Sequence, residues 1–222
     1  MNSLAVRSPR RQVAQQKADP RQLLWEPRGP DEVGNLTRNG FTNKENIAMA
    51  ATKKAIANKG LEDMFLDGLR DIYYAEKKIL KALPKMARGA EDQQVTAAFE
   101  KHLAETEGQV ERLEEVFEIL GTAARGKTCP AIDGILEEGS EILEDYKGSV
   151  SLDAGLVGAA QAVEHYEIAR YGTLIAWATS LGRDDVAELL NANLEEEKAT
   201  DEALTSLGEA GVNDRAAEQQ AA

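Results

Sequence analysis

The sequence of 222 residues has little of several features that mark other classes of protein. Its one cysteine, Cys129, cannot form an internal disulfide, so we expect a reducing compartment, the cytoplasm. No run approaches 18 apolar residues and no apolar core of a secretory signal stands at the start, so we expect no membrane span. Aromatic residues make up 5% and prolines number six. Ala, Leu, Glu and Lys predominate instead; these are strong helix formers, which favours an all-α fold.

Charge is spread unevenly along the chain. Residues 1–60 hold 11 Lys and Arg against 5 Asp and Glu, whereas the remaining residues hold 15 against 34. An acidic domain repels nucleic acids and anionic membranes, and it attracts cations. We therefore expect no membrane partner, and only the basic N-terminal part offers an alternative in which nucleic acid is bound.

The two ends of the chain lack helical periodicity. Residues 1–60 combine prolines, glycines and basic residues with one small apolar spot, which predicts a disordered basic leader. Met49 opens a run that resembles an ordinary protein start, so residues 1–48 are alternatively an over-extended start. After Gly208 the chain is polar and rich in alanine, which predicts a disordered tail over 208–222.

Between these ends, apolar residues recur three or four positions apart, as on one face of a helix. Pro84 predicts a kink or an end of the first helix, and Gly89 is a plausible terminator after it. Gly121 and Gly182 follow two other helices as terminators. Ser151 and Asp184 are candidate N-caps. The predicted helices span about 61–82, 91–120, 131–146, 152–181 and 185–207.

The connections between these helices favour one architecture. The only long connection, about 122–150, joins the second and third long helices and contains the short one. One long crossover at that place is typical of ferritin-like bundles. We therefore predict an antiparallel, ferritin-like four-helix bundle over 61–207, with a short fifth helix in the crossover.

Acidic residues and a histidine fall on the apolar stripes of all four long helices. Burying one unpaired carboxylate costs several kcal/mol, so their recurrence calls for a compensating charge. Two divalent cations would neutralise four carboxylates, and oxygen-rich sites with an imidazole suit iron or manganese. The candidate metal ligands are Glu76, His102, Glu105, Glu164, Glu167, Glu197 and Asp201.

Each candidate also has a purely structural reading. Glu76 and Glu105 fit solvated positions, and His102 fits a core histidine bonded to a carbonyl. His165 is expected on the flank of its helix. Tyr73 or Tyr171 is expected to hydrogen-bond a metal ligand or a bound oxygen species.

Five segments resemble the YciE/YciF family, in the same order along the chain. The resemblance implies a ferritin-like four-helix bundle, often dimeric, that is linked with bacterial stress responses, and by superfamily analogy a dinuclear metal site. Thr200 and Gly108 stand where Glu-x-x-His motifs of the wider superfamily would place histidines. The segments are 69–76, 99–106, 129–139, 163–174 and 194–201.

Two functions follow as hypotheses. The first is a stress-defence protein with a carboxylate-rich dinuclear iron or manganese site, which reduces peroxide or sequesters metal. The second is a non-catalytic helical stress protein that acts as a homodimer without metal. The sequence leaves open whether the protein is an enzyme.

Overall fold

The computed structural model describes residues 59–218, and these are helical with no strand. The predicted all-α class is therefore confirmed for this part of the chain. Except for Lys59 and Gly60, the predicted leader lies outside the described residues. The five longest helices are α2 (Leu61–Gly89), α3 (Gln93–Ile119), α4 (Pro130–Asp145), α5 (Leu152–Ser180) and α6 (Asp184–Leu207).

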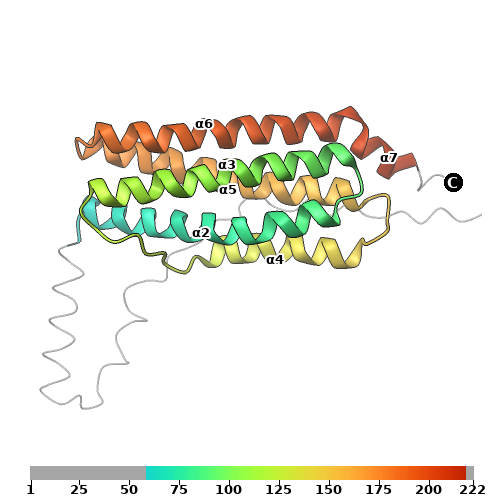
Figure 1. The fold of residues 1–222 in the computed structure, drawn as a ribbon, viewed down its shortest axis with the longest axis horizontal. Coiled ribbons are helices and arrows are strands. Elements are labelled where there is room, and N and C mark those ends of the chain that lie inside the picture. The colour runs from blue at the N-terminus through green and yellow to red at the C-terminus, as the bar shows by residue number, and fades with distance from the viewer. Residues whose placement is uncertain (1–58, 219–222) are drawn as a thin grey trace, which may run out of the picture. The chain divides into compact units, whose positions relative to one another are not determined.

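The long helices lie side by side, and their apolar faces meet in a common core (Figure 1). α2 packs against α3 and α5, and α6 packs against α5 and α3. The shorter α4 follows a long connection from α3 and lies along α2 and α5. The largest fully buried side chains of this core include Phe65, Phe99, Leu113, Leu156 and Leu174.

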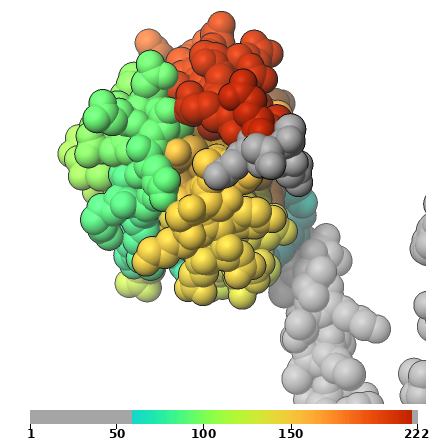
Figure 2. All heavy atoms as spheres, turned by 90° about the vertical axis from the view of Figure 1, so that its right-hand side faces the viewer, coloured from blue at the N-terminus to red at the C-terminus, as the bar shows by residue number. Residues whose placement is uncertain are grey.

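One end of the helical unit gathers the α2–α3 turn, the α4–α5 turn and residues 208–218 (Figure 2). Asp92 caps α3, because its Oδ1 accepts hydrogen bonds from the amides of Gln94 and Val95 at 2.7 and 3.3 Å. Asp153, in the first turn of α5, accepts from the amides of Glu91 and Asp92, each at 2.9 Å. A carboxylate of one helix thus satisfies backbone donors in the turn before another.

The predicted ends of α2, α5 and α6 hold only in part. α2 continues past Pro84 to Gly89, because Leu83 and Met86 beyond the proline stay buried in the core. Their burial outweighs the one backbone donor that proline removes. Ser151 is the N-cap residue of α5, as predicted, although its side chain makes no capping hydrogen bond. Asp184 was wrong as an N-cap, because α6 begins at Asp184 itself.

The other predicted terminators agree with the structure. Gly121 and Gly182 adopt φ values of +64° and +70°, the left-handed conformation that ends α3 and α5. None of the helices among the described residues is long and apolar enough to cross a membrane.

The C-terminal segment differs from the disordered tail that the sequence predicts. A π-helical turn, η3 (Gly208–Val212), leads into a short helix, α7 (Asn213–Glu218). Val212 is buried, and Arg215 pairs with Asp92. One apolar anchor and one ion pair therefore hold a segment whose composition alone indicates no structure.

Candidate metal centre

Four of the predicted ligands meet inside the helical unit. His102 comes from α3, Glu164 and Glu167 from α5, and Glu197 from α6. One ligand atom from each lies within 4.8 Å of all the others, and all four side chains are buried. Glu164 and Glu167 share this cluster because residues three apart lie on the same helix face. Glu76 of α2 is also fully buried. Its charge raises the pKa values of both Glu164 and Glu167, which shows that it lies beside the cluster.

Most polar atoms of this cluster have no hydrogen-bond partner among the described residues. Leaving a buried donor or acceptor unsatisfied costs about 1–3 kcal/mol, and more when it is charged. Natural proteins keep such atoms rare, and a group of them in one place needs an explanation. The ten atoms that make no hydrogen bond of good geometry are Glu76 Oε2, both imidazole nitrogens of His102, both amide atoms of Gln109, Glu164 Oε2, and both carboxylate oxygens of Glu167 and of Glu197. One of them, His102 Nε2, lies 3.2 Å from Glu164 Oε1, as a contact without hydrogen-bond geometry.

Burial shifts the pKa of every ionisable member. It raises the pKa of Glu164 to about 7, and neighbouring carboxylates add to this. The pKa values of Glu76, Glu167 and Glu197 lie well above their usual range, first because of burial and then because of the other acidic groups. Burial lowers the pKa of His102 to about 4, so its imidazole is neutral near pH 7 and has a lone pair available for a metal.

A chain of hydrogen bonds joins the cluster to the protein surface. The Tyr171 hydroxyl donates to Glu76, and the Asn193 amide donates to the Tyr171 hydroxyl at 2.8 Å. Arg112 in turn donates to the Asn193 side chain and to Glu196. The Arg112 side chain is 25% exposed, so one end of this chain reaches solvent while the other is fully buried.

Three residues were not predicted as members of the site: Arg112 and Asn193, which belong to the chain of hydrogen bonds, and Gln109, whose side-chain amide has no partner. Gln109 and Asn193 carry a readable signal, since both are polar residues at apolar-stripe positions. Arg112 carries none, because its long side chain reaches the cluster from a half-exposed position. Tyr73 hydrogen-bonds Glu114 at 2.7 Å instead, so of the two predicted tyrosines only Tyr171 contacts the site.

Two predicted ligands lie at the margin of the cluster. The Glu105 side chain is 23% exposed, pairs with Lys101 and accepts from the Thr200 hydroxyl at 3.4 Å. The Asp201 side chain is 24% exposed and lies 3.2 Å from the imidazole of His165. Neither belongs to the group of four that meet.

His165 lies on the flank of α5, as predicted, and its side chain is 69% exposed. It therefore belongs to the surface, while His102 is the one histidine of the buried cluster.

These features define a class: an all-helical protein whose long helices enclose a cluster of carboxylates with one histidine. The chain belongs to the family described as "Domain of unknown function (DUF892)", which matches residues 60–217. It is 45% identical over 159 residues to protein YciF of Escherichia coli strain K12, an alignment that covers 71% of this chain and 96% of YciF. The predicted resemblance to the YciE/YciF family is thereby confirmed.

Solved structures agree with this assignment. The crystal structure of the E. coli stress protein YciF matches with a TM-score of 0.67 at 45% identity, over 70% of this chain and 98% of that one. YcfI from Rhodopseudomonas palustris, named as a candidate structural protein, matches with a TM-score of 0.65 at 51% identity, over 67% and 94%. A protein of Xanthomonas campestris pv. campestris matches with a TM-score of 0.56 at 25% identity, over 72% and 98%.

Proposed function

We propose that this protein is a ferritin-like stress-response protein whose buried cluster holds two divalent metal ions, iron or manganese. The ten partnerless polar atoms, gathered in one place between the helices, carry the proposal. A cation is the partner that carboxylate oxygens and a neutral imidazole share. The proposed ligands are Glu76, His102, Glu164, Glu167 and Glu197.

Charge supports two ions rather than one. Glu76, Glu164, Glu167 and Glu197 would carry four negative charges when ionised, and two divalent cations balance four. Without cations, burial and mutual repulsion hold the pKa values of all four up. A donor set of carboxylates with a single imidazole suits iron or manganese better than zinc or copper.

Glu105 and Asp201 are proposed as outer members of the site. The charge of Glu105 acts on His102, and that of Asp201 acts on Glu164, so both lie near the ligands. The position of α4 supports the ferritin-like assignment, since a single long crossover joins the second and third long helices.

The metal ions would supply redox chemistry for the reduction of peroxide, or a reversible store of metal. The chain's own part is to hold them in a site that excludes water. Tyr171 orients Glu76 by donating to its carboxylate, and Asn193 fixes the tyrosine in turn. Consumption of hydrogen peroxide by the loaded protein separates these two uses of the site.

Metal analysis after equilibrium dialysis tests the proposal. The wild-type chain should retain about two Fe or Mn ions and unfold at a higher temperature once loaded. Glu164→Ala and Glu167→Ala should lose the ions, whereas Glu195→Gln, at an exposed position two residues from Glu197, should keep them. Protein that retains no metal and shows no thermal shift would favour the alternative, a non-catalytic helical stress protein.

We further propose that the chain forms a homodimer and acts in the cytoplasm. Large exposed apolar side chains support an interface, among them Leu61 and Met64 at the start of α2 and Ile119 at the end of α3. Light scattering on the eluting peak of a sizing column should give twice the mass of one chain, and a monomer would contradict this.

A further inference from the structure

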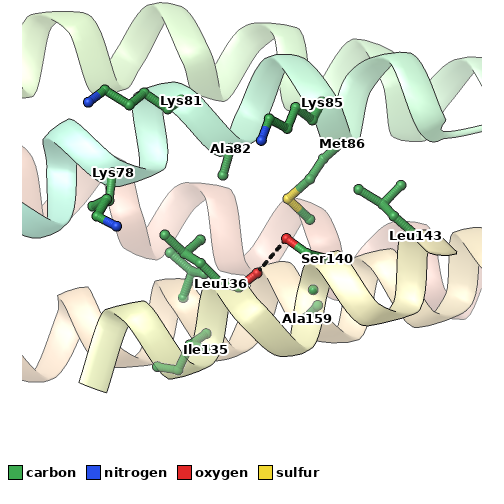
Figure 3. A pocket seen from close by; sticks show the side chains of 12 residues that line it. Lys78, Lys81, Ala82, Lys85, Met86, Ile135, Leu136, Ser140, Leu143 and Ala159 are labelled. Atoms are coloured by element: carbon green, nitrogen blue, oxygen red, sulfur yellow. Dashed lines mark hydrogen bonds between the residues drawn. The ribbon is translucent and has the colours of Figure 1, made fainter. Parts of the chain in front are cut away.

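A groove on the face of α2 that turns toward α4 lies outside the metal cluster. Its cavity of about 250 Å³ runs between the two helices, with α5 beneath. Ala82 and Met86 point into it from α2, and Leu136 and Leu143 border it from α4 (Figure 3). The floor is therefore apolar, and the volume of the cavity is slightly below the roughly 300–1,000 Å³ typical of small-molecule sites.

A second cavity of about 480 Å³ adjoins this groove at the ends of α2 and α4. The two share Lys85 and Leu143 as lining residues, so they are neighbours, and we call them together the depression. Arg88 and Lys147 line the second part. The groove with its apolar floor thus leads toward an opening lined by three basic side chains and one acidic one, Glu91.

The basic residues of this depression stand out in an acidic molecule. Of the 16 Lys and Arg among residues 59–218, eleven form an ion pair with a described carboxylate. Four of the five that form none within the described part line the depression: Lys81, Lys85, Arg88 and Lys147. Carboxylates outnumber bases in this part of the chain, so unpaired bases gathered in one place point to an anionic occupant that comes from outside.

We propose that this depression binds a free fatty acid, a single-chain anionic amphiphile. The alkyl chain lies between α2 and α4 over Ala82, Met86 and Leu136. The carboxylate lies in the opening, where Lys85, Arg88 and Lys147 surround it. Apolar burial supplies the affinity for the chain, and the basic side chains select the anionic head group.

Other occupants fit less well. The leader over residues 1–60 is itself basic, with 11 Lys and Arg against 5 Asp and Glu, so the lysines would repel it. A helix of a second copy is about 10–12 Å across with its side chains. A cavity of about 250 Å³ does not hold such a helix. An uncharged lipid leaves the four bases without a partner.

Methionine methyl NMR tests the proposal on the full-length chain, with decanoate as the probe. Met86 lies in the groove, while Met64, 57% exposed, lies 22 residues earlier on α2, roughly 33 Å away. Decanoate below its micelle concentration should shift the Met86 signal in a saturable way and leave Met64 unchanged. Parallel shifts of both signals would overturn the proposal, because they indicate non-specific association.

Variants identify the role of each part. Lys85→Gln with Lys147→Gln should weaken decanoate binding roughly tenfold, since two of the three bases that surround the carboxylate are lost. The matched control, Lys59→Gln with Lys127→Gln, removes two lysines that pair with Asp67 near the start of α2 and should leave binding unchanged. Ala82→Leu should block the groove. Equal weakening by both lysine pairs, or no effect of Ala82→Leu, would overturn the site.

Two further probes separate head group from chain and free acid from membrane. Decanol should bind at least about tenfold more weakly than decanoate, because it lacks the charge that the bases select. Equal binding of the two would overturn the role of the bases. Binding to anionic phospholipid vesicles without binding of monomeric decanoate would identify a membrane surface instead and would also overturn the proposal.

Discussion

At the scale of single residues, the buried carboxyl groups dominate the behaviour of the protein. A carboxyl group whose pKa is raised by folding binds a proton more tightly in the native than in the unfolded state. Stability from such a group is present below its unfolded pKa and is lost as the pH rises through the folded value. For Glu164 this window runs from its usual 4.5 to about 7.

The metal-free protein should therefore lose stability between pH 6.5 and about pH 8. His102 opposes this loss only slightly: its pKa falls from 6.5 to about 4 on folding, so its deprotonation in the unfolded state above pH 6.5 adds about 0.4 kcal/mol of stability. The raised pKa values of Glu164 and its three neighbours should lower the free energy of unfolding by at least about 1 kcal/mol. Urea titrations at pH 6.5 and pH 8 measure this difference in the free energy of unfolding. Glu167→Gln should reduce the loss, and a flat profile would contradict the assigned shifts.

Removing the Tyr171 hydroxyl should destabilise the metal-free protein. Tyr171→Phe leaves the Glu76 carboxylate without its donor and the Asn193 amide without one of its acceptors, inside the core. The expected cost is about 1–3 kcal/mol in chemical denaturation. Tyr74→Phe is the matched control: its hydroxyl contacts Asp133 at a part-buried position, so the loss should be smaller. Equal losses of stability in Tyr171→Phe and Tyr74→Phe would show that the buried hydrogen bond stabilises the protein no more than the part-buried one.

At the scale of helices, the sequence predicted existence and order well and the ends less well. Apolar residues three or four apart locate the four long helices and the shorter α4, because each helix must bury one face. The predicted end of α2 near residue 82 was wrong, while the terminator Gly89 was right. Local propensity reads Pro84 as a stop, but the core contacts of Leu83 and Met86 lie far away in sequence. Likewise, no local pattern shows that Asp153 serves the turn before α3.

Asp153→Ala should therefore weaken the junction of two helix pairs. It leaves the amides of Glu91 and Asp92 without their carboxylate, and we expect a loss of about 1–3 kcal/mol in thermal or chemical unfolding. Asp184→Ala provides the comparison, because this exposed residue makes no side-chain cap. Its loss should stay within about 0.3–1 kcal/mol, the effect of an acidic group near a helix start. A larger loss for Asp184→Ala would contradict this account.

At the scale of the whole molecule, the sequence located most of the candidate site and missed its support. Periodicity placed Glu76, His102, Glu164, Glu167 and Glu197 on inward faces, and the structure brings these together. Periodicity gives only the approximate direction of a side chain around its helix axis, so it cannot tell a residue at the centre of the buried face from one at its edge. Glu105 and Asp201, which share stripes with true members of the cluster, therefore turn out at its margin. The partners of Tyr171 depend on packing between helices and were not predictable from spacing.

The same whole-molecule view links acidity to function. A chain with 34 acidic residues after residue 60 attracts cations over its surface, yet within residues 59–218 only one place buries carboxylates without partners. Among the described residues, that place is also the only group with metal-ligand spacing. Surface charge and buried site therefore favour the same class of ligand.

Anomalous diffraction from a crystal grown with Mn²⁺ tests the central claim most directly. Data collected at the manganese edge should show two peaks among Glu76, His102, Glu164, Glu167 and Glu197, and Glu167→Gln should weaken or remove them. The absence of any anomalous peak in this cluster at saturating Mn²⁺ and Fe²⁺, with the side chains ordered, would contradict the account.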